Sequence, residues 1–135
     1  MSRYCVDTSG YSFFQRGDEP VVELFDSAEW LGIPATVLGE IEVGFLLGNQ
    51  SARNRQALDR FLDHPSVSEI PTNHRIGEIY AELLVALRRA GTPIPTNDIW
   101  IGAAAVVTGS TVVSYDAHFK QMPQVRSLIL PQPSR

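Results

Sequence analysis

The sequence has 135 residues, of which 44% are hydrophobic and 19% charged, and this length and apolar content fit one globular domain rather than two. The single cysteine, Cys5, excludes an internal disulfide, and no set of Cys and His residues has zinc-finger spacing. Fifteen acidic against eleven basic residues give a net charge of -4, which by itself argues against a nucleic-acid-binding module. We expect a single domain over residues 1–135, with a short tail at 131–135.

The first half of the chain alternates short apolar segments with helical patterns. A strand is expected at 3–6, and the turn and capping residues at 7–10 predict that a helix starts there. An amphipathic helix follows over 18–30, and Gly32 is expected to end it. The remaining elements of this half are a strand at 33–37 and a helix over 38–48.

The second half continues the alternation. The clearest helix covers 73–90, where apolar residues recur every three or four positions until Gly91. A nearly wholly apolar helix over 99–108 follows capping side chains at 96–98 and is expected to be buried almost all round. Alternating strands and helices predict an α/β fold with a mostly parallel sheet. The other expected elements are a helix over 53–63 and strands at 67–70, 111–114 and 128–130.

Four acidic residues fall at the edge of this predicted sheet where strands end and helices begin. Asp7 follows the first strand, Glu40 lies in the first turn after the second, Asp98 opens the apolar helix, and Asp116 follows the strand at 111–114. Ligands of open parallel sheets bind at this edge. Each acid alone also fits a helix cap, a first-turn position or a turn.

Carboxylates this close repel one another, so the cluster requires a cation or raised pKa values. Because the set offers only oxygen ligands, the expected ion is Mg²⁺ or Mn²⁺. Such an ion can activate water and stabilise charge on a phosphate, which suits phosphodiester hydrolysis. Without the four site acids, the chain carries eleven acids and eleven bases, so its acidic balance is compatible with a nucleic-acid substrate.

The segments around these acids carry a family resemblance. The strings VDTSG, TVLGEIEVGF, TNDIWIGAAA and VVSYDAHF resemble the four acidic motifs of PIN-domain proteins, most closely of VapC-type toxins from toxin–antitoxin pairs. They occur in the family's order and approximate spacing from Asp7 to Phe119. One departure is Gly102, which stands where alanine is more common.

The resemblance implies a three-layer α/β/α PIN-like domain with a central, mostly parallel sheet. It implies that Asp7, Glu40, Asp98 and Asp116 form the catalytic metal site, with Asp7 and Asp98 as principal ligands. Thr8 and Ser114 then match hydroxyl groups that support the ligands through hydrogen bonds. The implied activity is Mg²⁺-dependent cleavage of RNA by an endoribonuclease toxin. The implied partners are a VapB-type antitoxin, whose C-terminal segment covers the site, a second copy in a homodimer, and a larger complex in which the antitoxin binds DNA.

Two other functions are also compatible with the sequence. An aspartyl-phosphate domain of receiver or phosphatase type also clusters acids at parallel strand ends, and Lys120 lies near Asp116 as such folds require. Receivers, however, place adjacent acids after the first strand, where this chain has Thr8 and Ser9. A catalytically silent PIN-like module that binds RNA or protein is the second alternative.

One histidine and two groups of arginines are further candidates for a functional role. His118 is interpreted as a companion of Phe119 after the fourth acid rather than as a base or ligand. Ten of the eleven bases are arginines, and two groups of them could contact RNA. These groups are Arg53, Arg55 and Arg60, and Arg75, Arg88 and Arg89.

The apolar residues exceed what one small core needs, so some are expected to form a homodimer or antitoxin surface. The N-terminus lacks the pattern of a secretory signal, and no long apolar run could cross a membrane, so a cytoplasmic location is expected. The apolar residues in question are Phe13, Phe14, Val21, Val22, Phe25, Trp30, Phe45 and Leu46.

Overall fold

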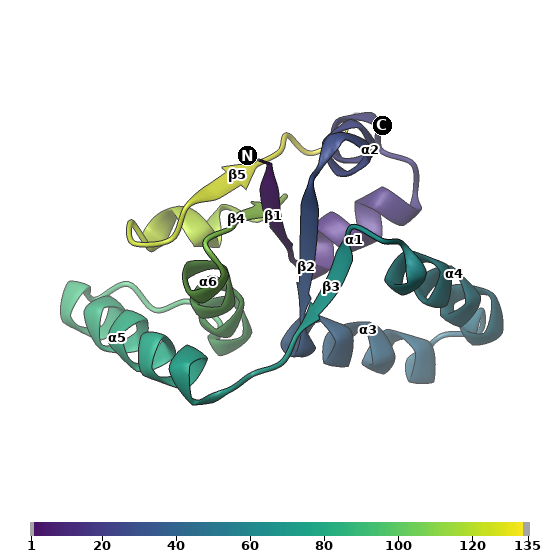
Figure 1. Ribbon diagram of the computed structural model, residues 1–135. Coiled ribbons are helices and arrows are strands. Elements are labelled where there is room, and N and C mark those ends of the chain that lie inside the picture. Colours follow the sequence, from purple (N-terminus) through teal and green to yellow (C-terminus); the bar gives the residue numbers. More distant parts are fainter. Residues whose placement is uncertain (1, 134–135) are drawn as a thin grey trace.

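Five parallel strands form the centre of the computed structural model, which describes residues 2–133 (Figure 1). The strands are β1 (Arg3–Val6), β2 (Trp30–Pro34), β3 (Val67–Ile70), β4 (Thr111–Ser114) and β5 (Ser127–Ile129). The helices are α1 (Thr8–Gln15), α2 (Glu19–Ser27), α3 (Ala35–Leu47), α4 (Ser51–Asp63), α5 (His74–Ala90), α6 (Thr96–Thr108) and the 3-10 helix η1 (Ala117–Gln121).

The strand order β3-β2-β1-β4-β5 places the first strand in the middle of the sheet. β1 pairs with both β2 and β4, and in the second pairing Val6 lies opposite Val113. The next residues along these strands are Asp7 and Ser114, so the register brings them to the same level at the carboxyl edge of the sheet.

Helices cover both faces of the sheet, as Figure 1 shows with α5 and α6 on one side of the strands and α1, α2 and α4 on the other. Apolar side chains of the sheet and of both helix layers form the core between them. This arrangement confirms the predicted three-layer α/β/α fold with a parallel sheet. The most deeply buried residues of the core include Val6, Ile33, Ile101, Val112, Val113 and Phe119.

The predicted boundaries were wrong around the second strand. The helix predicted for 18–30 ends at Ser27, and Trp30 begins β2, where it pairs with Arg3. Gly32 does not end a helix: it lies within β2, where a Cβ atom would meet the Trp30 ring at 2.2 Å. Residues 35–37 begin α3 rather than extend the strand, and Pro34, the last residue of β2, is the N-cap residue of that helix.

Most other elements agree with the sequence to within a few residues. α5 begins after Asn73, whose side chain accepts a hydrogen bond from the Ile76 N–H, and ends at Gly91, where φ is 68°. α4 begins two residues before the predicted helix, at Ser51, and α6 begins three residues before its predicted start, at Thr96. β5 begins one residue early, at Ser127. The predicted tail at 131–135 has no helix or strand over 131–133, and residues 134–135 lie outside the described residues.

The apolar residues expected at an interface are mostly used within the fold. Val21, Phe25 and Phe45 are buried, and Phe13, Phe14 and Trp30 pack against the core. Leu46 differs, since it is 84% exposed beside the exposed Leu47 and Val43 on α3. Within residues 2–133, no helix combines the length and the apolar composition needed to cross a membrane.

Candidate metal centre

Three structural positions bring the four acids to the carboxyl edge of the sheet. Asp7 and Asp116 are the N-cap residues of α1 and η1, directly after β1 and shortly after β4. Asp98 lies in the first turn of α6. Glu40 is the sixth residue of α3, so it occupies the second turn of that helix and not the predicted first turn.

Asp7 is almost completely buried, with 4% of its surface exposed. Its Oδ1 accepts hydrogen bonds from the Gly10 N–H at 2.7 Å and from the Ser9 hydroxyl at 3.0 Å. Its Oδ2 accepts a hydrogen bond of 2.5 Å from the Ser114 hydroxyl. Ser114 also accepts a hydrogen bond from the Asp116 N–H at 2.9 Å, so one serine fixes the positions of two acids.

Burial raises the pKa of Asp7 from 3.8 to about 6. The hydrogen bonds from Ser114, Gly10 and Ser9 act in the opposite direction because they stabilise the carboxylate, and the negative charge of Asp98 adds to the increase. Burial therefore makes the ionised form of Asp7 unfavourable in the folded protein, and a bound cation at this position would offset that cost.

Asp98 and Asp116 converge on the ring of His118. The His118 Nδ1 atom lies 2.9 Å from Asp98 Oδ2 and 3.0 Å from Asp116 Oδ2. One ligand atom from each of the three residues lies within 4.8 Å of the others, which is close enough to share a metal ion. Burial raises the pKa of Asp98, the hydrogen bond with His118 lowers it, and the charges of Asp116 and Glu40 raise it.

Glu40 is held by the residue that follows Asp7. The Thr8 hydroxyl donates a hydrogen bond of 2.6 Å to Glu40 Oε1. Thr8 and Ser114, predicted as supporting hydroxyl groups, thus each contact an acid of the cluster. Because Asp7 interacts with the charge of Asp98, and Asp98 with those of Asp116 and Glu40, the four acids form one electrostatic group.

Two residues near the acids make contacts in the site that the sequence did not predict. His118, interpreted as a structural companion of Phe119, bridges two carboxylates through its ring nitrogen. Ser9, which lies within the VDTSG string but was assigned no role in the site, donates to Asp7 and accepts a hydrogen bond from the Tyr115 N–H at 3.0 Å. Its only local signal is its place two residues after the first acid.

Residues 4–125 match the PIN domain family. The chain belongs to the PIN domain family. A relative of this PIN domain is Ribonuclease VapC4 of Mycobacterium tuberculosis, 27% identical over 106 residues, which cover 78% of this chain and 81% of that protein.

Solved structures show the same PIN fold. A VapBC2 structure from Rickettsia felis, bound to a DNA fragment from its promoter, superposes with a TM-score of 0.83 at 22% identity and covers 95% of this chain and 98% of that one. VapBC-1 from nontypeable Haemophilus influenzae also gives a TM-score of 0.83, at 17% identity, covering 94% of this chain and 97% of that one. At such identities, the likeness establishes the fold.

Proposed function

We propose that this PIN domain is a metal-dependent endoribonuclease, the toxin of a VapBC-type toxin–antitoxin pair. The observation that carries the proposal is the convergence of the Asp98 and Asp116 carboxylates, next to the buried carboxylate of Asp7 and within the electrostatic reach of Glu40. The ribonuclease name of the Mycobacterium tuberculosis relative supports the same reaction.

The four acids suit a hard divalent cation. In the proposed centre, Asp7 and Asp98 hold Mg²⁺ or Mn²⁺, and Glu40 and Asp116 complete the site through water or a second ion. Burial raises the pKa values of Asp7 and Asp98, so a positive charge at this position relieves an unfavourable environment in both. When bound, the ion supplies a nucleophilic water at neutral pH and neutralises charge on the phosphate.

The remaining residues of the site orient these acids. Ser9, Ser114 and the Gly10 N–H fix both oxygens of Asp7, and Thr8 fixes Glu40. Hydrogen bonds of this kind hold carboxylates in the geometry that an ion and a phosphate require. Hydrolysis adds the elements of water across one P–O bond of RNA and releases two chain ends.

Partners and location follow from the same proposal. We expect a VapB-type antitoxin that covers the site, a homodimer, and a complex in which the antitoxin binds DNA. The Rickettsia felis relative was solved as a VapBC pair on promoter DNA, which supports this expectation. The cytoplasm, where RNA is available, is the proposed location.

The aspartyl-phosphate alternative fits the site poorly. Receiver domains place adjacent acids after the first strand, where this chain has Thr8 and Ser9, and both of these hydroxyl groups instead donate hydrogen bonds to acids of the site. A silent binding module remains distinguishable from the proposed enzyme by its lack of cleavage.

The test compares the protein with two Asp→Asn variants on a mixture of tRNA and rRNA in Mg²⁺ or Mn²⁺. Asp98→Asn is expected to reduce cleavage at least about 100-fold, because loss of groups outside the ligand shell alone typically costs 10–100-fold. Asp26→Asn, an exposed acid on α2, is the matched control and should cleave at the rate of the unchanged protein.

Metal binding is measured separately by calorimetric titration with Mn²⁺, which should show a site in the unchanged protein and in Asp26→Asn but not in Asp98→Asn. Cleavage that continues in EDTA would exclude the metal mechanism. Absence of cleavage on every RNA, with Mn²⁺ bound, would instead favour the silent module.

A further inference from the structure

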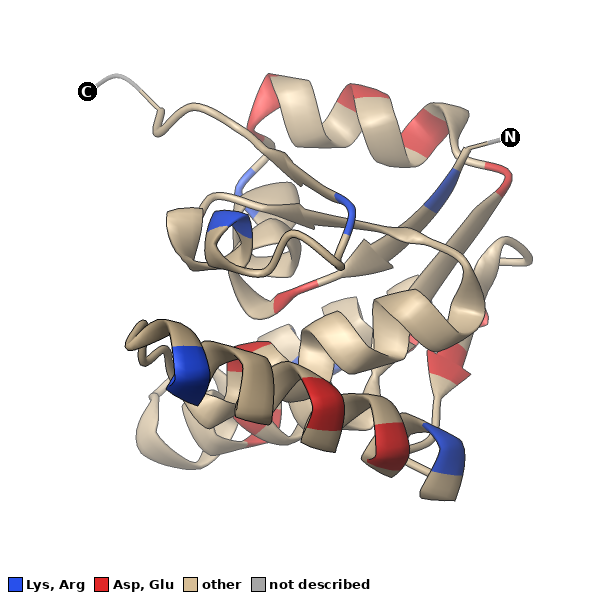
Figure 2. Cartoon of the chain, turned by 90° about the vertical axis from the view of Figure 1, so that its left-hand side faces the viewer, with Lys and Arg blue, Asp and Glu red and all other residues tan. Residues whose placement is uncertain are grey.

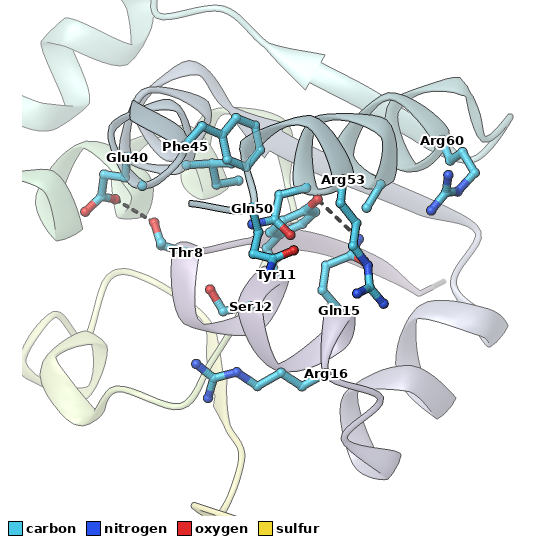
Figure 3. A pocket seen from close by; sticks show the side chains of 14 residues that line it. Thr8, Tyr11, Ser12, Gln15, Arg16, Glu40, Phe45, Gln50, Arg53 and Arg60 are labelled. Atoms are coloured by element: carbon cyan, nitrogen blue, oxygen red, sulfur yellow. Dashed lines mark hydrogen bonds between the residues drawn. The ribbon is translucent and has the colours of Figure 1, made fainter. Parts of the chain in front are cut away.

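A pocket of about 750 Å³ opens beside the acidic site, between α1, α3 and α4. Thr8 and Glu40, which are hydrogen-bonded to each other, line one end of it (Figure 3). Figure 3 shows Arg60 toward the opposite end, with Arg53 between them. The pocket therefore continues directly from the acids that we assign to catalysis.

Three arginines give this pocket a positive charge. Arg16, Arg53 and Arg60 line it, and we call it the arginine pocket. Glu40, at the catalytic end, is the single acid among its lining residues. Within residues 2–133, none of the three arginines takes part in an ion pair, so their guanidinium groups are available for an anion.

The spacing of the arginines suits a repeating anion. Arg53 and Arg60 are seven residues apart on α4, which places them on one face of the helix about 10 Å apart along its axis. Arg16, at the end of α1, lies on the facing wall of the pocket. The guanidinium group binds phosphate through a rigid pair of N–H donors.

Neutral hydrogen-bonding groups lie between the charged ones. The side chains of Gln15, Gln50 and Asn54 and the hydroxyl of Ser12 also line the arginine pocket. Amide and hydroxyl groups, together with arginine, are the groups that contact phosphate and sugar in nucleic-acid complexes. Apolar residues also line the pocket, among them Ile41, Phe45 and Ala57, but its three arginines and its hydrogen-bonding groups favour a polar strand with regular negative charge as the occupant.

The other arginines considered for RNA contact are placed differently. Arg55, two residues from Arg53, projects from the other side of α4 and pairs with Glu42 at 2.6 Å. On α5, the basic residues at the two ends are separated by Glu78 and Glu82, as Figure 2 shows by red segments between blue ones. Of the two predicted groups of arginines, only Arg53 and Arg60 line the pocket, whereas the others lie beside acidic residues or outside it.

We propose that the arginine pocket holds phosphates of the RNA strand that flank the cleaved bond, an inference that rests on the proposed function. The strand enters along Arg53 and Arg60 and reaches the acids at Thr8 and Glu40. Phosphate contacts of this kind fix the register of a strand on the protein without reading its sequence.

The test measures the affinity of a fluorescent 12-nucleotide RNA by anisotropy at increasing KCl, in the Asp98→Asn background so that the RNA stays intact. The variant Arg16→Ala/Arg53→Ala/Arg60→Ala is compared with Arg55→Ala, its matched control on the same helix. For single strands, the salt dependence of log K has a slope of about -0.7 per phosphate contact.

The triple variant is therefore expected to lose about two units of slope magnitude and at least about tenfold in affinity at 0.1 M salt. Arg55→Ala should stay within about twofold and keep the slope. Circular dichroism and thermal unfolding check that the variants are folded. If the triple variant is not folded, the single variant Arg53→Gln replaces it in the test and is expected to lose about 0.7 of the slope magnitude.

An unchanged slope in the folded triple variant would overturn the inference, as would an equal loss in Arg55→Ala, which would indicate a response to net charge alone. Polyglutamate is titrated in parallel. If the triple variant loses polyglutamate binding but keeps RNA binding, the pocket takes an acidic protein segment and the RNA assignment is wrong. These outcomes are separable from the proposed function, which fails when the unchanged protein cleaves no RNA or cleaves it equally well in EDTA.

Discussion

Among the four acids, Asp7 combines the deepest burial with the largest number of hydrogen bonds. Ser9, Gly10 and Ser114 occupy its two oxygens, while burial raises its pKa to about 6. The hydrogen bonds position the carboxylate, but they do not fully replace the water that burial removes. In the absence of a cation, the charged form of Asp7 therefore destabilises the folded protein.

The pH dependence of stability follows from this residue. Because the pKa is higher in the folded state than its usual 3.8, protons favour folding, and the free energy of unfolding should fall as pH rises from about 4 to about 6. The full effect above pH 6 is up to about 3 kcal/mol. Asp7→Asn should reduce this dependence, leaving the contribution of Asp98, whose pKa burial also raises, and should stabilise the metal-free protein at pH 8.

Urea unfolding in EDTA at pH 4, 5, 6 and 8 provides the measurement, with Asp26→Asn as the control that follows the unchanged protein. Lower stability of Asp7→Asn than of the unchanged protein at pH 8 would show that the hydrogen bonds of Asp7 outweigh its burial.

A glycine next to this site should be irreplaceable for steric reasons. A Cβ atom at Gly10 would lie 2.8 Å from the Val113 carbonyl oxygen and 3.1 Å from Asp7 Oδ1. The first neighbour is strand backbone, so Gly10→Ala should push α1 away from β4 and cost about 1–3 kcal/mol of stability. Gly77→Ala on α5, where a Cβ meets nothing within 4 Å, should instead stabilise by about 1 kcal/mol.

Urea unfolding of both glycine variants measures the two effects. RNA cleavage should fall only in Gly10→Ala, because that change displaces the N–H that holds Asp7. Similar stabilities for the two variants would refute the steric argument.

Among the elements, α5 was predictable because its signals are local. Its apolar period, its N-cap Asn73 and its left-handed Gly91 all lie within one stretch of sequence. The boundary between α2 and β2 was not predictable in the same way. Trp30 joins the sheet because it pairs with Arg3 and its ring lies 4.2 Å from the Arg3 guanidinium, contacts made by a distant segment.

The candidate site, too, has features that local sequence predicts and features that it does not predict. The four acids could be found because each lies at a strand end or near a helix start, positions that the sequence marks. The contacts that organise them could not, because they join distant segments: Ser9 meets Tyr115 and His118 meets Asp98. Neither contact leaves a periodic or capping signal in the sequence.

The N-cap of α5 gives a test at this scale. The Asn73 side chain accepts a hydrogen bond of 3.0 Å from the Ile76 N–H, and Asn73→Ala should lower the free energy of unfolding by about 1 kcal/mol. The exposed neighbour Thr72→Ala should change it little. Because no acid of the site lies on α5, cleavage by both variants should match that of the unchanged protein, and a loss specific to Asn73→Ala would reveal coupling between α5 and the site.

At the scale of the whole molecule, the proposed metal centre predicts a link between metal binding and the stability of the fold. The acids lie at the starts of three different helices, with Asp7 at α1, Asp98 at α6 and Asp116 at η1. An ion that they share therefore connects segments of the fold that are far apart in sequence. A ligand that binds only the folded state stabilises it by mass action.

Mn²⁺ should therefore raise the free energy of unfolding, by about 2.7 kcal/mol at a concentration 100 times Kd. Thermal or urea unfolding at pH 7.5 with and without Mn²⁺ measures this effect, and Asp98→Asn should abolish it. Equal stabilisation of Asp98→Asn would place the ion elsewhere on the protein.

The central position of β1 also governs when activity can arise during protein synthesis. β1 (Arg3–Val6) is made before one of its two partners, β4 (Thr111–Ser114), and before the acids Asp98 and Asp116. Such pairing between distant segments delays folding until both are present. A ribosome-bound chain whose residue 116 is still inside the ribosome therefore has no complete site, so the proposed RNA cleavage cannot begin until the segment through Asp116 has emerged.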